Sequence, residues 1–96
     1  MINIVVRTIL GMEKYLNGYK SQIIKIPEDY DVGDLMKYLV NMFGKDFEDA
    51  MFDKEGNLKK GIFLMVNGIN IFAKEGFEMK LKDGDRFLIF PPVAGG

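Results

Sequence analysis

The chain has 96 residues, with 13 basic and 14 acidic side chains, a formal net charge of −1 and 48% hydrophobic residues. This composition predicts a single globular domain, residues 1–96, that folds without disulfides or metals, and it lacks the basic excess of a nucleic-acid-binding protein. No cysteine or histidine is present, which removes thiol nucleophiles, Ser-His pairs and the usual zinc sites.

The N-terminal part of the chain predicts two strands. Residues 2–9 (INIVVRTI) are rich in β-branched side chains and end before Gly11, and residues 19–26 end at Pro27, which cannot donate to a strand ladder. The segment MEKYLN between them is compatible with one or two helical turns or with a loop. INIVVRTIL lacks the features of a signal peptide, and no stretch reaches the ~18 apolar residues of a membrane helix. We therefore expect a cytoplasmic protein with no membrane partner.

A helix is predicted next, with both of its ends marked. Asp31 is a candidate N-cap, Asp34 follows three residues later, and Gly44 supplies the stop. Residues 46–52 are compatible with a second short helix, and DKEGN after them reads as a turn. The apolar residues of the first helix recur at helical spacing and so lie on one face, as a stripe. They are Val32, Leu35, Met36, Leu39 and Phe43.

The C-terminal part of the chain predicts three more strands. Residues 62–66 and 69–72 flank the dipeptide NG, a strong hairpin signal, and a KDGD turn leads into a last strand at residues 86–90. Several strands with one principal helix give an α+β fold, in which a mixed sheet has that helix packed on one face.

The other face of this sheet is predicted to be partly uncovered. The segments IFLMV and RFLIF are apolar in both alternation phases, which is typical of strands covered on both sides, yet one principal helix covers only one side. The outward apolar side chains are therefore either a partner surface or ordinary exposed hydrophobic residues. The pattern alone leaves both interpretations open.

The terminal segment FPPVAGG is the candidate functional part of the chain. Pro91 and Pro92 end the last strand because they have a fixed φ and no N–H donor. Ala94, Gly95 and Gly96 carry almost no side chain, so they can enter a channel as narrow as a backbone and deliver a carboxylate to a partner's active site. A carboxylate becomes an acyl donor once it is joined to AMP as a mixed anhydride. The alternative is a flexible end with no function.

A metal site is not predicted. The acidic cluster within residues 46–55 is more simply a solvated surface, because DKEGNLKKG lacks the closing Glu of a calcium loop. The DGD segment at residues 83–85 is more simply a turn. No bound cofactor is expected either.

Residues 81–96, LKDGDRFLIFPPVAGG, resemble the C-terminal signature of the small subunit of molybdopterin synthase, in which an L-x-D-G-D turn precedes an apolar strand and PP-V-x-GG. IPEDYDVGDLMKYL and FDKEGNLKKGIFLMVNG are similar to the same family, so the resemblance covers most of the chain and is weakest over residues 11–21. Residues 45–60 also suit the ubiquitin-related modifiers and archaeal small modifiers of this superfamily.

The resemblance implies a β-grasp fold with a central last strand, a projecting tail at residues 91–96, and a sulfur carrier that has no catalytic side chain. A ubiquitin-activating-like adenylyltransferase would use ATP to adenylate Gly96, and a sulfur donor protein would convert it to a thiocarboxylate. The tail, with Gly95, Ala94 and Val93 behind Gly96, would then insert into the large subunit of molybdopterin synthase, which builds the dithiolene of molybdopterin.

The resemblance also implies a contact surface for these partners. Leu88 and Phe90 would face outward on the uncovered side of the sheet, while Phe87 and Ile89 point into the core. A core position for Phe90 is the alternative. The implied contact residues are Leu88, Phe90, Pro91 and Pro92.

Three other functions compete with the sulfur carrier. A ubiquitin-like modifier would use the same activation to join Gly96 to lysines of target proteins. A pure interaction module would not use its terminus. A metabolic enzyme is disfavoured, because the sequence has no nucleophile system, metal set or phosphate-binding glycine loop. The PPVAGG ending favours molybdopterin over thiamin-type sulfur transfer and leaves molybdenum and tungsten pathways, sulfur donor and oligomeric state open.

Overall fold

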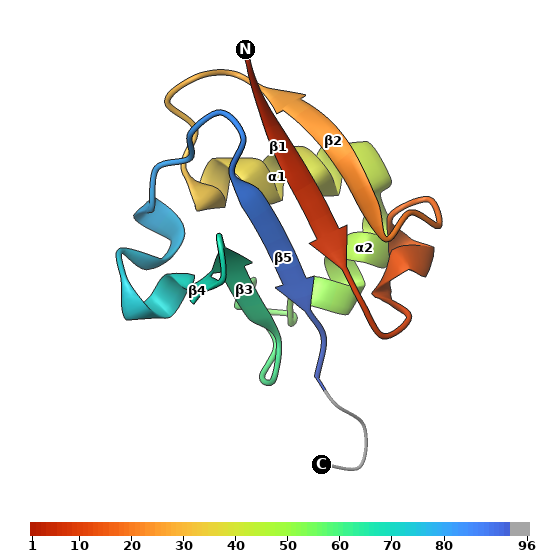
Figure 1. Cartoon of the computed structure of the whole chain (residues 1–96). Helices are drawn as coiled ribbons and strands as arrows, with labels where there is room; N and C mark the ends of the chain where they lie inside the picture. Colours follow the sequence, from red (N-terminus) through yellow and green to blue (C-terminus); the bar gives the residue numbers. More distant parts are fainter. Residues whose placement is uncertain (93–96) are drawn as a thin grey trace.

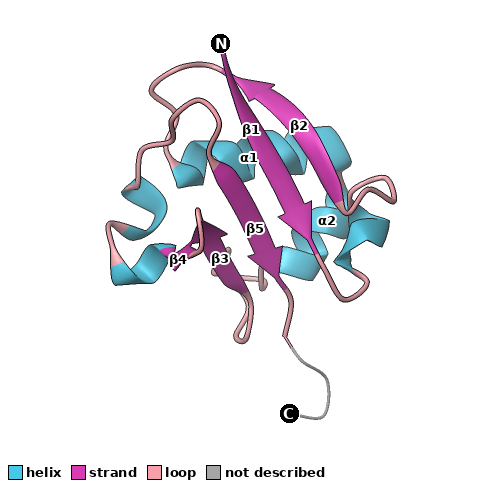
Figure 2. Cartoon of the chain, in the orientation of Figure 1, coloured by secondary structure: helices cyan, strands magenta, loops and turns pink. Residues whose placement is uncertain are grey.

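The computed structural model describes residues 1–92 and shows a mixed five-stranded sheet with two α-helices behind it (Figures 1 and 2). The sheet order is β2-β1-β5-β3-β4, with β1 and β5 parallel and the other pairs antiparallel. The predicted α+β, β-grasp fold with a central last strand is confirmed. The elements are β1 (Ile2–Thr8), β2 (Ser21–Ile26), α1 (Val32–Phe43), α2 (Lys45–Met51), β3 (Phe63–Val66), β4 (Ile69–Asn70) and β5 (Arg86–Phe90).

Helix α1 begins and ends where the sequence predicts. The Asp31 carboxylate accepts the backbone N–H of Asp34 at 2.8 Å, and the Asp34 carboxylate accepts that of Asp31 at 3.0 Å, so two otherwise unpaired donors are satisfied. The hydrogen bond that the Asp34 carboxylate accepts from the backbone N–H of Asp31 is the main reason that the pKa of Asp34 is lowered. At the other end, Gly44 has a φ of 91° and stops the helix.

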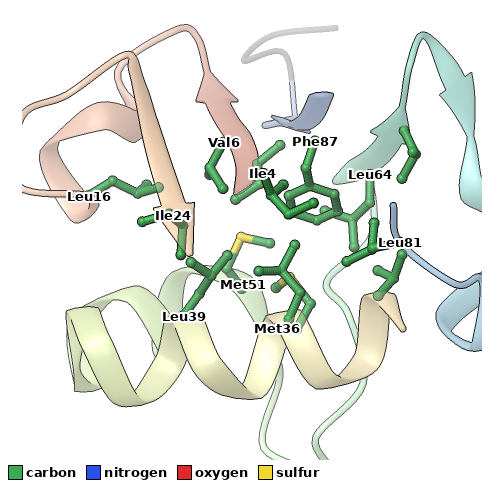
Figure 3. Close-up of a cluster of buried hydrophobic side chains, with 14 of the residues drawn as sticks. Ile4, Val6, Leu16, Ile24, Met36, Leu39, Met51, Leu64, Leu81 and Phe87 are labelled. Carbon is green, nitrogen blue, oxygen red and sulfur yellow. The ribbon is translucent and has the colours of Figure 1, made fainter. Parts of the chain in front are cut away.

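The core lies between the sheet and the two helices (Figure 3). The short helix α2 is held there by Phe47 and Met51, which are fully buried, because seven residues do not form a stable helix by themselves. Phe43, the last member of the predicted stripe, is only partly buried and packs against Phe47, with their ring centroids 5.9 Å apart. The other four members of the stripe are at most 2% exposed: Val32, Leu35, Met36 and Leu39.

The connections differ in part from the predictions. Positive φ angles of 52° at Asn67 and 82° at Gly68 confirm the tight hairpin. The predicted strand at residues 69–72 was too long, because the Asn70 side chain accepts the backbone N–H of Phe72 at 2.9 Å and a 3-10 helix, Ile71–Ala73, begins there. MEKYLN contains one 3-10 turn. Within residues 1–92, no helix is both long enough and apolar enough to cross a membrane.

Candidate functional site

The last strand, β5, presents alternate residues to the two faces of the sheet. Phe87 and Ile89 are 0% exposed and lie in the core, whereas Leu88 and Phe90 are partly buried on the face that points away from the helices. The predicted orientation of all four side chains is confirmed. Because β5 is central and leads directly to Pro91, this outward face adjoins the base of the tail (Figure 1).

Neighbouring strands extend the outward apolar surface on both sides of β5. Phe63 on β3 is 46% exposed and pairs with Phe90, and the two rings meet edge to face with centroids 6.4 Å apart. On the far side, Ile23 of β2 is 66% exposed and pairs with Val5 of β1. We call this surface the open-face patch; its members are Val5, Ile23, Phe63, Met65, Leu88 and Phe90.

The charged side chains at the outward positions of β1, β2, β3 and β5 are all basic. They are Arg7, Lys25 and Arg86, which the strand register places on the same face as Val5 and Leu88. All three are exposed, although the chain as a whole carries a net charge of −1. A basic rim around an apolar centre complements a partner surface that carries acidic side chains.

The base of the tail is built into the fold. The hydroxyl of Thr8, a buried residue on β1, donates to the backbone oxygen of Ile89 at 3.0 Å. Pro91 is buried whereas Pro92 is exposed. Pro91 therefore supports the tail from within the fold. The sequence-based prediction placed Pro91 among the contact residues, but its side chain is not accessible to a partner. Pro92 remains available to a partner.

The remaining predicted site residues are those of the tail itself. Val93, Ala94, Gly95 and Gly96 lie outside the described residues, so their predicted roles in tail insertion and acyl transfer stay predictions.

The acidic turns use their carboxylates to hold the backbone. Asp83 accepts the backbone N–H of Asn3 at 2.7 Å, and Asp53 accepts those of Glu55 and Asn57, each at 2.9 Å. Within residues 1–92, no group of three or more acidic side chains is arranged to hold a metal ion. These carboxylates are best explained as turn-forming groups.

The only ion pair in the described part of the chain is an exposed one on α2. Lys45 donates to Asp49 at 3.1 Å, one helical turn away, and this hydrogen bond raises the pKa of Lys45. Exposed pairs of this kind contribute little to stability. The pair lies on a helix, away from the open-face patch.

Sequence reasoning named Leu88 and Phe90 of the open-face patch but missed Val5, Ile23 and Phe63. The signal for Phe63 was present in IFLMV, whose two alternation phases are both apolar, but it did not say which phase faces outward. That choice depends on the register with β5, which pairs residues far apart in the chain.

Comparison with known proteins gives related sequences and a related fold. The model of the ThiS family matches residues 8–96. A candidate sulfur carrier protein of Archaeoglobus fulgidus is 38% identical over 69 residues, which cover 72% of this chain and 77% of that protein. Small archaeal modifier protein 3 of Haloferax volcanii is 32% identical over 79 residues, which cover 82% of this chain and 84% of that protein. The solved structure of a candidate molybdopterin converting factor subunit 1 from Pyrococcus furiosus is 25% identical, with a TM-score of 0.75, and the match covers 97% of this chain and 100% of that one.

Proposed function

Since the chain belongs to the ThiS family, we propose that it is a sulfur carrier whose Gly96 carboxyl group delivers sulfur for the dithiolene of molybdopterin. One observation carries the proposal: the central strand β5 bears the open-face patch and continues directly into the PPVAGG segment. One continuous stretch of chain thus contains both residues of the recognition surface and a C-terminal carboxyl group that follows residues with almost no side chain. The molybdopterin assignment is supported by this ending and by the similarity to the converting-factor subunit.

The proposed chemistry takes place at the end of the main chain. A carboxylate oxygen of Gly96 attacks the α-phosphorus of ATP in an adenylyltransferase of the ubiquitin-activating type, and pyrophosphate leaves. Sulfide from a sulfur donor protein then attacks the acyl carbon, AMP leaves with its electron pair, and a thiocarboxylate remains. After the sulfur passes to the pterin precursor, water restores the carboxylate.

The catalytic side chains of this proposal belong to the partners. The large subunit of molybdopterin synthase receives the tail, and the adenylyltransferase consumes the ATP, so the carrier itself needs no bound cofactor or metal. Its own contribution is recognition and presentation. Gly96 forms the acyl-adenylate and then the thiocarboxylate, while Gly95, Ala94 and Val93 let the tail pass through a narrow channel.

Recognition is assigned to the open-face patch. Phe63 and Phe90 are the proposed anchors, because paired aromatic side chains that become fully buried dominate the energy of an interface. Leu88 and Pro92 complete the contact between these rings and the tail. The basic rim accelerates association with an acidic partner surface and orients it.

Intact-mass measurement tests the proposal. The purified chain is incubated with ATP, a sulfide source and candidate adenylyltransferases, and the expected product is heavier by about 16 Da because one oxygen is replaced by sulfur. The same mixture without ATP is the control. Failure of every adenylyltransferase of the source organism to produce this adduct would contradict the proposed function.

A second candidate function is that of a protein modifier, and the similarity to small archaeal modifier protein 3 favours it. It uses the same adenylate, but a target lysine amine replaces sulfide as the attacking group. Trypsin cuts after Arg86, so conjugated lysines would carry residues 87–96, FLIFPPVAGG, as a branched remnant. Such remnants in cell extracts would support the modifier. Their absence, together with a cofactor deficiency in a deletion strain, would support the sulfur carrier.

A further inference from the structure

Gly61 lies directly against Pro92, the last residue of the described chain. A Cβ added at Gly61 would stand 2.8 Å from the Cβ of Pro92 and 3.5 Å from its Cα, which is closer than non-bonded carbon atoms approach. Gly61 also has a φ of +87°. Only glycine therefore allows the backbone of this turn to touch the proline ring.

The turn that carries Gly61 is fixed by the core. The backbone N–H of Lys59 donates to the oxygen of Met51 at 2.9 Å, and that of Ile62 donates to the oxygen of Lys59 at 3.3 Å. Ile62 is 5% exposed and Met51, at the end of α2, is 0% exposed. The contact surface under Pro92 is thus held in place by α2 and the first buried residue before β3.

The chain that reaches Pro92 is held from the other side as well. The Thr8 hydroxyl binds the backbone oxygen of Ile89, Phe90 pairs with Phe63, and Pro91 is buried. Proline rings restrict φ to about −65°. The position of Pro92, at the end of the described chain, is consequently held by contacts on both sides.

We propose that Gly61 is a positioning residue that seats Pro92 and so aims the tail at the active site of the activating enzyme. This inference rests on the proposed function. It also gives α2 and the loop after it a role, because together they hold Gly61 in contact with Pro92. Gly61 touches no reacting atom and acts only through Pro92. Misdirection of a reacting group by about 1 Å lowers a rate by up to about a hundredfold.

The chain provides a matched control in the same connection between α2 and β3. Gly56 has a φ of +83°, close to that of Gly61, but a Cβ added there meets no atom within 4 Å. Gly56→Ala and Gly61→Ala therefore impose the same kind of backbone strain. Only Gly61→Ala also meets Pro92.

The first experiment measures pyrophosphate exchange by an adenylyltransferase that accepts the wild-type chain. Gly61→Ala should lower kcat about tenfold or more relative to Gly56→Ala, while KM for the carrier changes less than about threefold, because the open-face patch is intact. Both variants should unfold at the same temperature. Combined with Pro92→Gly, which removes the Cβ that the alanine meets, Gly61→Ala should cause no further loss beyond that of Pro92→Gly alone.

The second experiment tests the seat without any enzyme. In the wild-type chain, a nuclear Overhauser effect should join the α protons of Gly61 to the β protons of Pro92, and Gly61→Ala, but not Gly56→Ala, should shift the amide resonance of Val93. If no adenylyltransferase accepts the wild-type chain, the proposed function fails while these spectra still decide whether Gly61 seats Pro92. Equal kcat values, or equal Val93 shifts, for the two alanine variants would overturn the positioning role.

Discussion

The two faces of the sheet are built from alternate residues of the same strands, yet they differ in what covers them. On β5, Phe87 and Ile89 are completely buried beneath the helices, while Leu88 and Phe90 remain partly exposed beside Phe63. Both sets are apolar, so the binary pattern alone does not distinguish them. The covered face therefore stabilises the fold, whereas the open face contributes less to stability and is free to serve recognition.

The largest expected effect comes from truncation on the covered face. Ile89→Ala should lower the free energy of unfolding by about 2–5 kcal/mol, because it leaves a cavity in the core. Its neighbour Leu88→Ala should cost about 1 kcal/mol or less. Urea denaturation of both variants measures the difference. Equal losses would show that the two faces contribute alike to stability.

Truncation on the open face should separate binding from stability. Phe90→Ala should weaken binding to the adenylyltransferase at least about tenfold, as loss of an aromatic anchor does, while the unfolding free energy changes by about 1 kcal/mol or less. Titration calorimetry measures the affinity. Phe72→Ala is the control, because Phe72 is 55% exposed but lies on the 3-10 helix after β4. Similar affinities for the two variants would argue against the patch.

Charge reversal on the rim should have a smaller effect. Arg86→Glu should lower the association rate about three- to tenfold at low salt, because rim charges act mainly on encounter, and the difference from wild type should shrink as salt is added. Lys74→Glu, away from the outward strand positions, is the matched control. Stopped-flow association at two salt concentrations measures both. Unchanged association by Arg86→Glu would mean that the rim does not steer the partner.

The smallest expected effect lies at the start of α1, on the covered side. The folded-state pKa of Asp34 is lowered from 3.8, mainly by the hydrogen bond from the Asp31 backbone, so its charged form stabilises the fold above that pH and the contribution is lost as the pH falls through the lowered value. Asp34→Asn should therefore lower the Tm slightly at pH 7 and not at about pH 2. A difference in Tm that persists in acid would contradict this assignment.

The elements with local signals were predictable, and those set by distant contacts were not. The reciprocal Asp31 and Asp34 caps and Gly44 fixed the bounds of α1, and the turn and the prolines fixed those of β5. The shortening of β4 was missed, because it depends on a side-chain cap at Asn70 that competes with strand pairing.

The same distinction holds for the candidate site. The outward positions of Leu88 and Phe90 were predicted from the family resemblance, because both alternation phases of RFLIF are apolar and do not identify the outward one. The burial of Pro91 and the contact between Gly61 and Pro92 were not predictable, because they join segments that are distant in the chain and depend on how the turn after α2 packs. Sequence patterns showed which residues are apolar or flexible, and only the fold showed which of them meet.

The central claim is that the reactive group is the carboxylate of Gly96, at the end of the segment that follows β5 in the sequence. It is tested most directly by adding one alanine after Gly96 and measuring thiocarboxylate formation by intact mass, with the untrimmed length confirmed in the same spectrum. We expect the wild-type chain to gain sulfur and the extended chain, with its fold and open-face patch unchanged, to gain none. An extended chain that takes up sulfur as readily as the wild type would contradict the account.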